Sequence, residues 1–277
     1  MKDNRSGDGP RAATAVPAAL VVVAFVAVLF LLGPLVALLL NIPWARAVEL
    51  VTGAGAVEAF GLSLTTAAVS TVLCIVLGLP LSLWLVELIR RRPPLGDAVT
   101  LVVYAPLVLS PVVSGLSLVF LWGRHGLIGE WLDMVAGVRV AFTPLAVIVV
   151  QVFVSLPFFV STTVTSLRAV PAVVQEAARV DGASRWQVLG RITVPLAGPG
   201  IAAGTVLGFA RALSEYGATL TFAGNVAGET RTIPLLIELG LSSNDMDQAL
   251  GACILLLGIY VLVVGGIATT TLLGRRR

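Results

Sequence analysis

Long uncharged apolar stretches recur along the chain, with shorter polar segments between them. Five of these stretches contain no charged residue, and a sixth, residues 198–220, contains two. Each has about 23 to 27 residues, enough to cross a bilayer as a tilted helix. Helices are expected because lipid cannot satisfy open backbone groups. The pattern predicts an all-α polytopic membrane protein with six transmembrane helices, at residues 18–40, 62–86, 98–122, 141–167, 198–220 and 249–273.

The composition supports one membrane-embedded domain and excludes several classes of function. Of 277 residues, 57% are hydrophobic and 12% are charged, and the mean hydropathy is +1.00. After six spans, no stretch is long enough for a separate soluble catalytic domain. The only lysine is Lys2, in the N-terminal tail, so the chain cannot supply the lysine of a P-loop. The net charge of +3 reflects membrane orientation, and we expect no nucleic-acid partner.

The distribution of basic residues predicts that both termini are cytoplasmic. If the chain starts inside and alternates, 13 of the 18 Lys and Arg residues fall in inner segments and four in outer ones. Arg211 then lies within the fifth span. Such an excess of basic residues in short inner segments sets the orientation of membrane proteins. The inner residues are Lys2, Arg5, Arg11, Arg90, Arg91, Arg92, Arg168, Arg179, Arg185, Arg191, Arg275, Arg276 and Arg277.

The two ends of the chain are predicted to be tails. Residues 1–16 are rich in Gly, Asp and Arg and indicate a disordered cytoplasmic tail, and residues 274–277 form a basic cytoplasmic end. The sequence at 45–47 resembles a signal-peptide cleavage site. However, residues 18–40 are longer than the apolar region of a signal peptide. We therefore expect a retained first helix, which with its outer loop occupies residues 17–56.

The inner connection between the fourth and fifth spans has an unusual pattern. Apolar residues at helical spacing surround Glu176 and Arg179, with Pro171 before them and Gly182 after them. Proline is typical of a helix start and glycine of a helix end, so a short amphipathic helix is predicted, followed by a segment that re-enters the bilayer at Pro195. The alternative is a helix that lies on the lipid headgroups.

This connection resembles the cytoplasmic signature of the permease subunits of ATP-binding-cassette (ABC) importers. That signature is Glu-Ala-Ala, three residues, Gly, nine residues, Ile, one residue and Leu-Pro. The matching residues are Glu176, Ala177, Ala178, Gly182, Ile192 and Pro195, with Val194 in place of Leu. The resemblance implies that residues 169–197, called the coupling loop below, dock on a separate cytoplasmic ATPase. It also implies that the ATPase uses ATP and Mg, and that this chain binds no cofactor and is not itself an enzyme.

The fifth span contains a small-residue stripe and a charged pair. Gly200, Gly204 and Gly208 recur every four residues, which allows close helix packing. Arg211 and Glu215 are four residues apart and can form an ion pair, since each alone would be costly in a bilayer. Two interpretations stay open: the pair braces the bundle, or Arg211, with Ser214, Glu215 and Thr219, lines a path for an anion.

Two further stretches resemble the subgroup of these permeases that moves tetrahedral oxyanions. They are residues 105–129 and residues 210–225 with the following 228–239. Ser214 departs from the Gly of the subgroup. The resemblance covers residues 57–272, as a type-1 ABC transmembrane domain. It implies a molybdate importer, with sulfate or tungstate as the alternative cargo. It also implies an extracytoplasmic oxyanion-binding protein and a second permease copy, in a homodimer surrounded by membrane lipid.

Other residue types do not indicate catalysis or metal binding. Cys74 and Cys253 lie in apolar stretches, and His125, the only histidine, has no cysteine or carboxylate cluster beside it. An intramembrane hydrolase would need a nucleophile and a base within the spans, and none is visible. An ion-coupled secondary carrier is a less favoured alternative, because it would need acidic residues on several helices and would not need the coupling loop.

Overall fold

The computed structural model describes residues 17–274, which form two units, residues 17–45 and residues 46–274. The predicted tails, residues 1–16 and the basic residues 275–277, lie outside the described residues. The first unit is the helix α1 (Ala18–Asn41) followed by the start of the turn η1 (Trp44–Arg46). Side-chain nitrogens of Asn41 and Trp44 donate hydrogen bonds to the carbonyls of Ala37 and Leu39, at 2.8 and 2.9 Å. These bonds satisfy carbonyls that a helix end leaves open.

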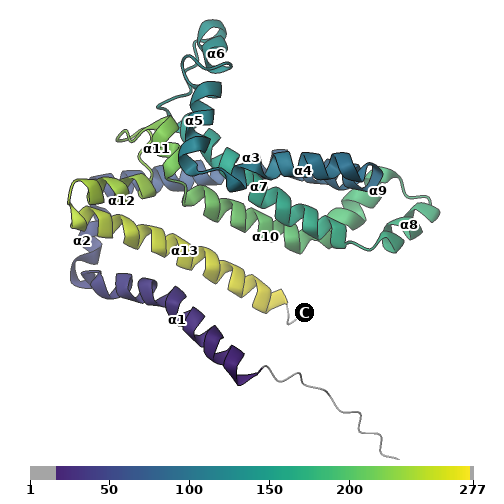
Figure 1. Cartoon of the computed structure of the whole chain (residues 1–277), viewed down its shortest axis with the longest axis horizontal. Coiled ribbons are helices and arrows are strands. Elements are labelled where there is room, and N and C mark those ends of the chain that lie inside the picture. Colours follow the sequence, from purple (N-terminus) through teal and green to yellow (C-terminus); the bar gives the residue numbers. More distant parts are fainter. Residues whose placement is uncertain (1–16, 275–277) are drawn as a thin grey trace, which may run out of the picture. The chain divides into compact units, whose positions relative to one another are not determined.

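The second unit consists of helices and the turns that connect them in its described residues (Figure 1). Its elements are α2 (Ala47–Thr52), α3 (Ala54–Arg91), α4 (Pro93–Val108), α5 (Pro111–Trp122), α6 (Gly129–Ala136), α7 (Pro144–Ala169), α8 (Ala172–Val180), α9 (Arg185–Val188), η2 (Leu189–Thr193), α10 (Val194–Leu213), α11 (Gly217–Ala223), α12 (Ile233–Ser242) and α13 (Met246–Gly274).

The core of this unit is formed where α7 packs against both α3 and α10. Figure 1 shows these helices side by side, with α4 along α3. The buried ring of Phe159 on α7 faces Gly78 on α3, where a Cβ atom would lie 2.5 Å from the ring carbon Cδ1. The absence of a side chain at Gly78 therefore sets the distance between these two helices.

A buried polar network also joins α3 to α7. The Ser70 hydroxyl donates to Gln151 Oε1 at 2.9 Å, and Gln151 Nε2 donates to the Thr66 hydroxyl at 3.2 Å. One turn further along, Cys74 Sγ lies 3.2 Å from Ser155 Oγ. In lipid, such contacts favour one alignment of two apolar helices. Cys74, which lies in an apolar stretch of the sequence, thus contacts a hydroxyl group.

Five of the described helices are long and apolar enough to cross a membrane, or six when the bent pair α4 and α5 counts as one span. The predicted span at residues 98–122 therefore falls in two helices, with a bend of 111° between them. The bend lies at Leu109 and Ser110, both in extended conformation. Pro111 explains it, since proline disfavours helical geometry in the residue before it. The Ser110 hydroxyl then caps α5 by accepting a hydrogen bond from the Val113 N–H at 3.3 Å.

The predicted span at residues 198–220 is also interrupted. The helix α10 ends at Leu213, and the short α11 begins at Gly217. Helices α5 and α11 pack closely, because Cβ atoms at Gly115 and Gly217 would lie 2.6 Å from Thr221 Cβ and 2.7 Å from Pro111 Cβ. The first turn of α11 thus packs against Pro111 at the start of α5, and Gly115 of α5 packs against Thr221 of α11.

Candidate functional site

The coupling loop forms a compact helical segment at one end of the second unit. The helix α8 covers Ala172–Val180, as the sequence predicts, and Pro171 precedes it. Gly182 ends the turn with a φ of +86°, a left-handed conformation that glycine adopts without strain. The N–H of Gly182 donates to the carbonyl of Arg179 at 3.1 Å, and that of Ala183 to the carbonyl of Ala178 at 2.9 Å. These bonds close the C-terminal end of α8.

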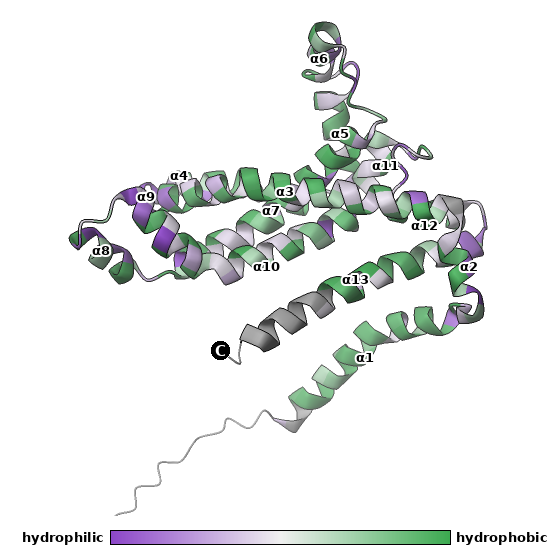
Figure 2. Ribbon diagram, turned by 180° about the vertical axis from the view of Figure 1, so that it is seen from behind, coloured by the Kyte–Doolittle hydropathy of each residue, from purple (hydrophilic) through white to green (hydrophobic). Residues whose placement is uncertain are grey.

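The outer face of this segment combines charge with exposed apolar side chains. Glu176 and Ala177 are exposed and Ala178 is half-buried. Val180 is 88% exposed and Trp186 is 82% exposed, and Val173 on the preceding turn is also exposed. Figure 2 shows both hydrophilic and hydrophobic residues on α8, and mainly hydrophilic residues around α9. An apolar surface of this kind on a short amphipathic helix is typical of a docking site.

The coupling loop continues into the membrane without a break. A capping box at Ser184 and Gln187 starts the helix α9, and the chain then stays helical through η2 and α10 as far as Leu213. η2 is one π-helical turn within it, which contains the half-buried Ile192. Pro195 lies exposed in the first turn of α10. The sequence predicted a segment after Gly182 that re-enters the bilayer at Pro195, and the structure has one helix of 29 residues there, which begins at Arg185 and includes Pro195.

The small-residue stripe of α10 faces α7. A Cβ atom at Gly200 would collide with the Ser166 side chain, and one at Gly204 would lie 3.1 Å from the carbonyl oxygen of Phe159. At Gly208 the nearest atom, Phe159 Cβ, would be 3.8 Å away. The stripe therefore lets the backbones of two membrane helices approach closely.

Arg211 and Glu215 form an ion pair where α10 ends. The distance between Arg211 Nη2 and Glu215 Oε2 is 2.6 Å, and the side chains are 27% and 2% exposed, respectively. Glu215 Oε1 accepts a hydrogen bond at 2.8 Å from the Ala218 N–H, in the first turn of α11. Both oxygens of Glu215 thus have partners, and the buried carboxylate joins the end of α10 to the start of α11. The guanidinium of Arg211 keeps an accessible side.

The two other residues predicted for the path differ in burial. Ser214 is exposed, and its hydroxyl donates to the carbonyl of Arg211 at 3.2 Å. Thr219 is fully buried, and its hydroxyl has no hydrogen-bond partner among the described residues. Only Arg211 and Ser214 therefore present polar atoms at an accessible surface, and Thr219 lies in the packing between α11 and its neighbours.

Two groups of polar residues were not singled out from the sequence. Gln151, within an apolar span, was not recognised, although a lone amide in such a stretch indicates an interhelical bond. The second group orders the turn between α11 and α12. Arg231 Nε donates to Asn225 Oδ1 at 2.9 Å, and the Thr230 hydroxyl donates to the carbonyl of Gly224 at 3.1 Å. The glycine at position 224 could have indicated this turn from the sequence, and it adopts a left-handed φ of +72°.

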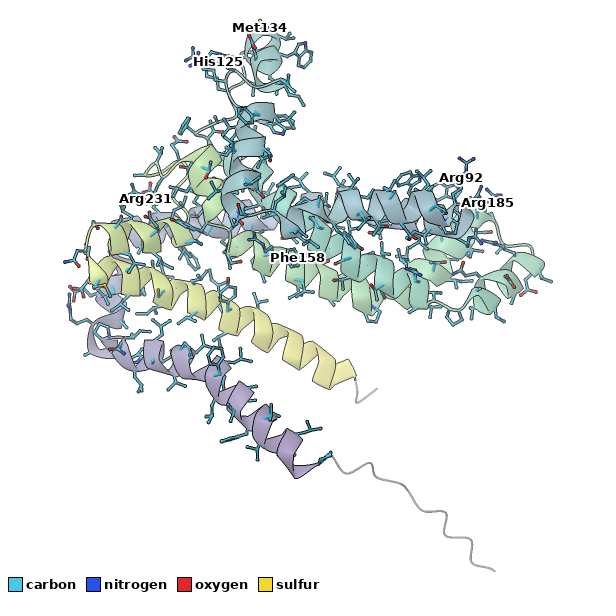
Figure 3. The ribbon with its side chains drawn as sticks, viewed as in Figure 1. Arg92, His125, Met134, Phe158, Arg185 and Arg231 are labelled. Atoms are coloured by element: carbon cyan, nitrogen blue, oxygen red, sulfur yellow. The ribbon has the colours of Figure 1, made fainter. Side chains whose placement is uncertain are left out.

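His125 lies beyond α5, at the end of the unit where Figure 3 also labels Met134 of α6. It is exposed. Within residues 17–274, no three His, Cys, Asp or Glu side chains lie close enough together to hold a metal ion. The coupling loop and the Arg211–Glu215 pair are the two features that the sequence singled out for function.

Residues 75–276 match the family described as the binding-protein-dependent transport system inner membrane component. The chain belongs to this family. It is the permease of an ABC importer and a multi-pass protein of the inner membrane. The family relationship agrees with the resemblance found in the coupling loop.

Relatives of the permease include permease proteins of molybdenum and sulfate transport systems. It is 42% identical to the molybdenum transport system permease protein ModB of Mycobacterium tuberculosis over 251 residues, which cover 91% of this chain and 93% of that protein. It is also 42% identical to ModB of Escherichia coli K12, over 58% of this chain and 71% of that protein. The sulfate transport system permease protein CysT of Escherichia coli K12 is 33% identical over 87% of both chains.

The same fold occurs in a crystal structure of a bacterial alginate ABC transporter in complex with a periplasmic protein that holds an alginate pentasaccharide. The TM-score is 0.71 at 23% identity, with 89% of the permease and 90% of that chain covered. At this identity the similarity shows a common arrangement of helices.

Proposed function

We propose that the permease forms the membrane path of a molybdate importer. Two copies of the chain would pair and associate with two cytoplasmic ATPase subunits and an extracytoplasmic oxyanion-binding protein. ATP and Mg would be used by the ATPase, and the permease itself would bind no cofactor. The identity to ModB proteins over 91% of the chain supports molybdate over sulfate, since the identity to CysT is nine percentage points lower.

The observation that carries the mechanism is the unbroken helix from Arg185 to Leu213. At 1.5 Å per residue, it extends for roughly 40 Å from the coupling loop to the Arg211 region. In the proposed mechanism the ATPase docks on the exposed apolar side chains of α8 and α9. Closure of the ATPase pair shifts this segment, and the shift reaches Arg211 because a continuous helix moves as one body.

The Arg211–Glu215 pair gives the path a weak attraction for anions. Glu215 is fully occupied by Arg211 and the Ala218 N–H, whereas Arg211 is 27% exposed. A single, partly neutralised guanidinium attracts a dianion without holding it tightly, which transport requires because the ion must also leave. Selection of the oxyanion would then reside mainly in the binding protein.

Uptake by the reconstituted complex tests the proposal. Proteoliposomes that contain the permease, its ATPase and the binding protein are given labelled molybdate, with tungstate or sulfate as unlabelled competitor. We expect ATP-dependent uptake of molybdate. Tungstate should reduce this uptake, and sulfate should not. Uptake that sulfate reduces more strongly would assign the permease to sulfate. Uptake that persists without the ATPase would instead indicate an ion-coupled carrier.

A further inference from the structure

A cavity of about 740 Å³ lies between the coupling loop and the ends of two membrane helices. Its wall is made by the last turns of α3, the last turn of α7 and the segment from α8 to η2. It is separate from the exposed outer face of α8 and from the Arg211–Glu215 pair. Neither the family relationship nor the proposed path accounts for it.

The charge of the cavity wall is strongly one-sided. Its only carboxylate is Glu87, which pairs with Arg90 Nη2 at 2.6 Å and with Arg91 Nε at 2.5 Å. The three other arginines of the wall are Arg168, Arg179 and Arg185. Among residues 17–274, no carboxylate lies within 4.0 Å of their guanidinium groups.

These three arginines come from three different helices, α7, α8 and α9. Their convergence is therefore a product of the tertiary fold, whereas a solvated face of one helix would carry its charges on that helix alone. Figure 3 shows Arg185 at the same end of the unit as Arg92, which follows α3. Guanidinium groups gathered around a concave surface suit an oxyanion, because each can bind phosphate oxygens through two parallel hydrogen bonds.

Apart from Gln175 and Thr193, the uncharged residues of the wall are apolar, which favours a ligand with an apolar part over a free anion. Leu83, Trp84 and Val86 line it from α3, and Leu167 and Val170 line it from the end of α7. Trp84 is 52% exposed, and tryptophan is enriched at the level of lipid headgroups. A free tetrahedral oxyanion gains nothing from these side chains, whereas the first methylene groups of an acyl chain are shielded from water by them.

We propose that this cavity binds the phosphate group of an acidic phospholipid, with the acyl chains lying along α3 beside Trp84. Basic pockets between transmembrane helices at a membrane surface bind headgroups of this kind. The lipid phosphate would connect Arg168 on the membrane helix α7 to Arg179 and Arg185 in the coupling loop. It would thereby lower the repulsion among these arginines.

Native mass spectrometry of the full-length permease tests this proposal. The protein in mild detergent is offered equal amounts of dioleoyl phosphatidylglycerol and dioleoyl phosphatidylcholine, which share acyl chains and a phosphodiester but differ in net charge. The wild type is expected to retain phosphatidylglycerol preferentially. In the double variant Arg168→Gln/Arg185→Gln that preference falls about tenfold, because each arginine near anionic lipid contributes to binding. Each single variant loses part of it, so the result does not depend on the double variant folding well.

The matched control is Arg92→Gln/Arg191→Gln, which removes the same charge from exposed residues at the same end that do not line the cavity. It is expected to keep the wild-type preference. Equal losses in the two double variants would overturn the proposal, because they would indicate general attraction to a basic surface. Displacement of the bound phosphatidylglycerol by an equal concentration of inorganic phosphate would also overturn it, by assigning the cavity to free oxyanions.

Discussion

The carboxylate of Glu215 lies 2.6 Å from the guanidinium of Arg211, and this ion pair lies at the interruption between α10 and α11. The two partners differ in burial. Glu215 is enclosed, while Arg211 is partly accessible, so removing one partner does not cost the same as removing the other.

Arg211→Gln is expected to destabilise the permease more than Glu215→Gln. The first leaves a buried carboxylate unpaired, which costs about 3 kcal/mol or more. The second leaves a partly exposed guanidinium and keeps an oxygen for the Ala218 N–H, so about 1 kcal/mol is expected. The double variant should be less destabilised than Arg211→Gln alone. Apparent unfolding temperatures of the purified variants check this order, and strictly additive losses would argue against the pair.

Gly182→Ala is expected to uncouple ATP hydrolysis from uptake while leaving membrane insertion intact. A residue with a Cβ pays about 1 to 2 kcal/mol for the left-handed φ of +86°. This cost is enough to lower the population of the correctly formed loop by roughly tenfold. Gly190→Ala is the matched control, because a Cβ there meets no atom within 4 Å. The ratio of uptake to ATP hydrolysis in proteoliposomes is the measurement. Equal ratios in both variants would contradict the role of this turn.

Glu176→Ala is expected to lower ATP-driven uptake by about tenfold, without changing the amount of permease in the membrane. Its carboxylate is exposed on α8, and a charge-assisted bond to a docked ATPase contributes about 1.5 to 3 kcal/mol. Glu130→Ala, an exposed glutamate on α6, serves as the control and should transport normally. Co-purification of the ATPase with each variant shows whether docking is affected. Wild-type recovery of the ATPase by Glu176→Ala would exclude this contact.

Gly78→Ala is expected to destabilise the α3–α7 packing by about 1 to 3 kcal/mol, since the added methyl group overlaps the Phe159 ring. Gly61→Ala on the same helix should be neutral or stabilising, because a Cβ there has open space. Combining Gly78→Ala with Phe159→Leu should recover part of the loss. Thermal unfolding of the wild type, the two glycine variants and the combined variant checks this. If the combined variant recovers no stability, the methyl group at position 78 does not overlap the Phe159 ring.

The sequence predicted features that depend on local chemistry. The helix at Ala172–Val180, its end at Gly182 and the pairing of Arg211 with Glu215 all follow from residue type and spacing over a few positions. The interruption at Ser110 was not predicted, because hydropathy is continuous across it. The interruption at Ser214 was not predicted either, although Arg211 and Glu215 break the apolar pattern there. Both are also supported by contacts between α5 and α11, which are distant in sequence.

Contacts between residues that are distant in sequence also explain why some polar residues were not singled out from the sequence. The role of Gln151 depends on Thr66 and Ser70, which precede it by about 80 residues. The convergence of arginines around the cavity likewise depends on where α7, α8 and α9 meet. Patterns along one segment cannot specify such meetings, although they correctly identify the segments that take part.

The 111° bend between α4 and α5 also constrains the order in which this protein can mature. Gly115 of α5 packs against Ala218 and Thr221 of α11, about 100 residues later in the chain. At about 5 to 20 residues per second, a ribosome needs roughly 5 to 20 seconds to synthesise that interval. During this time α5 lacks its native cover. The nascent permease must therefore pass through a stage in which its third apolar segment is made but its bend is not yet supported.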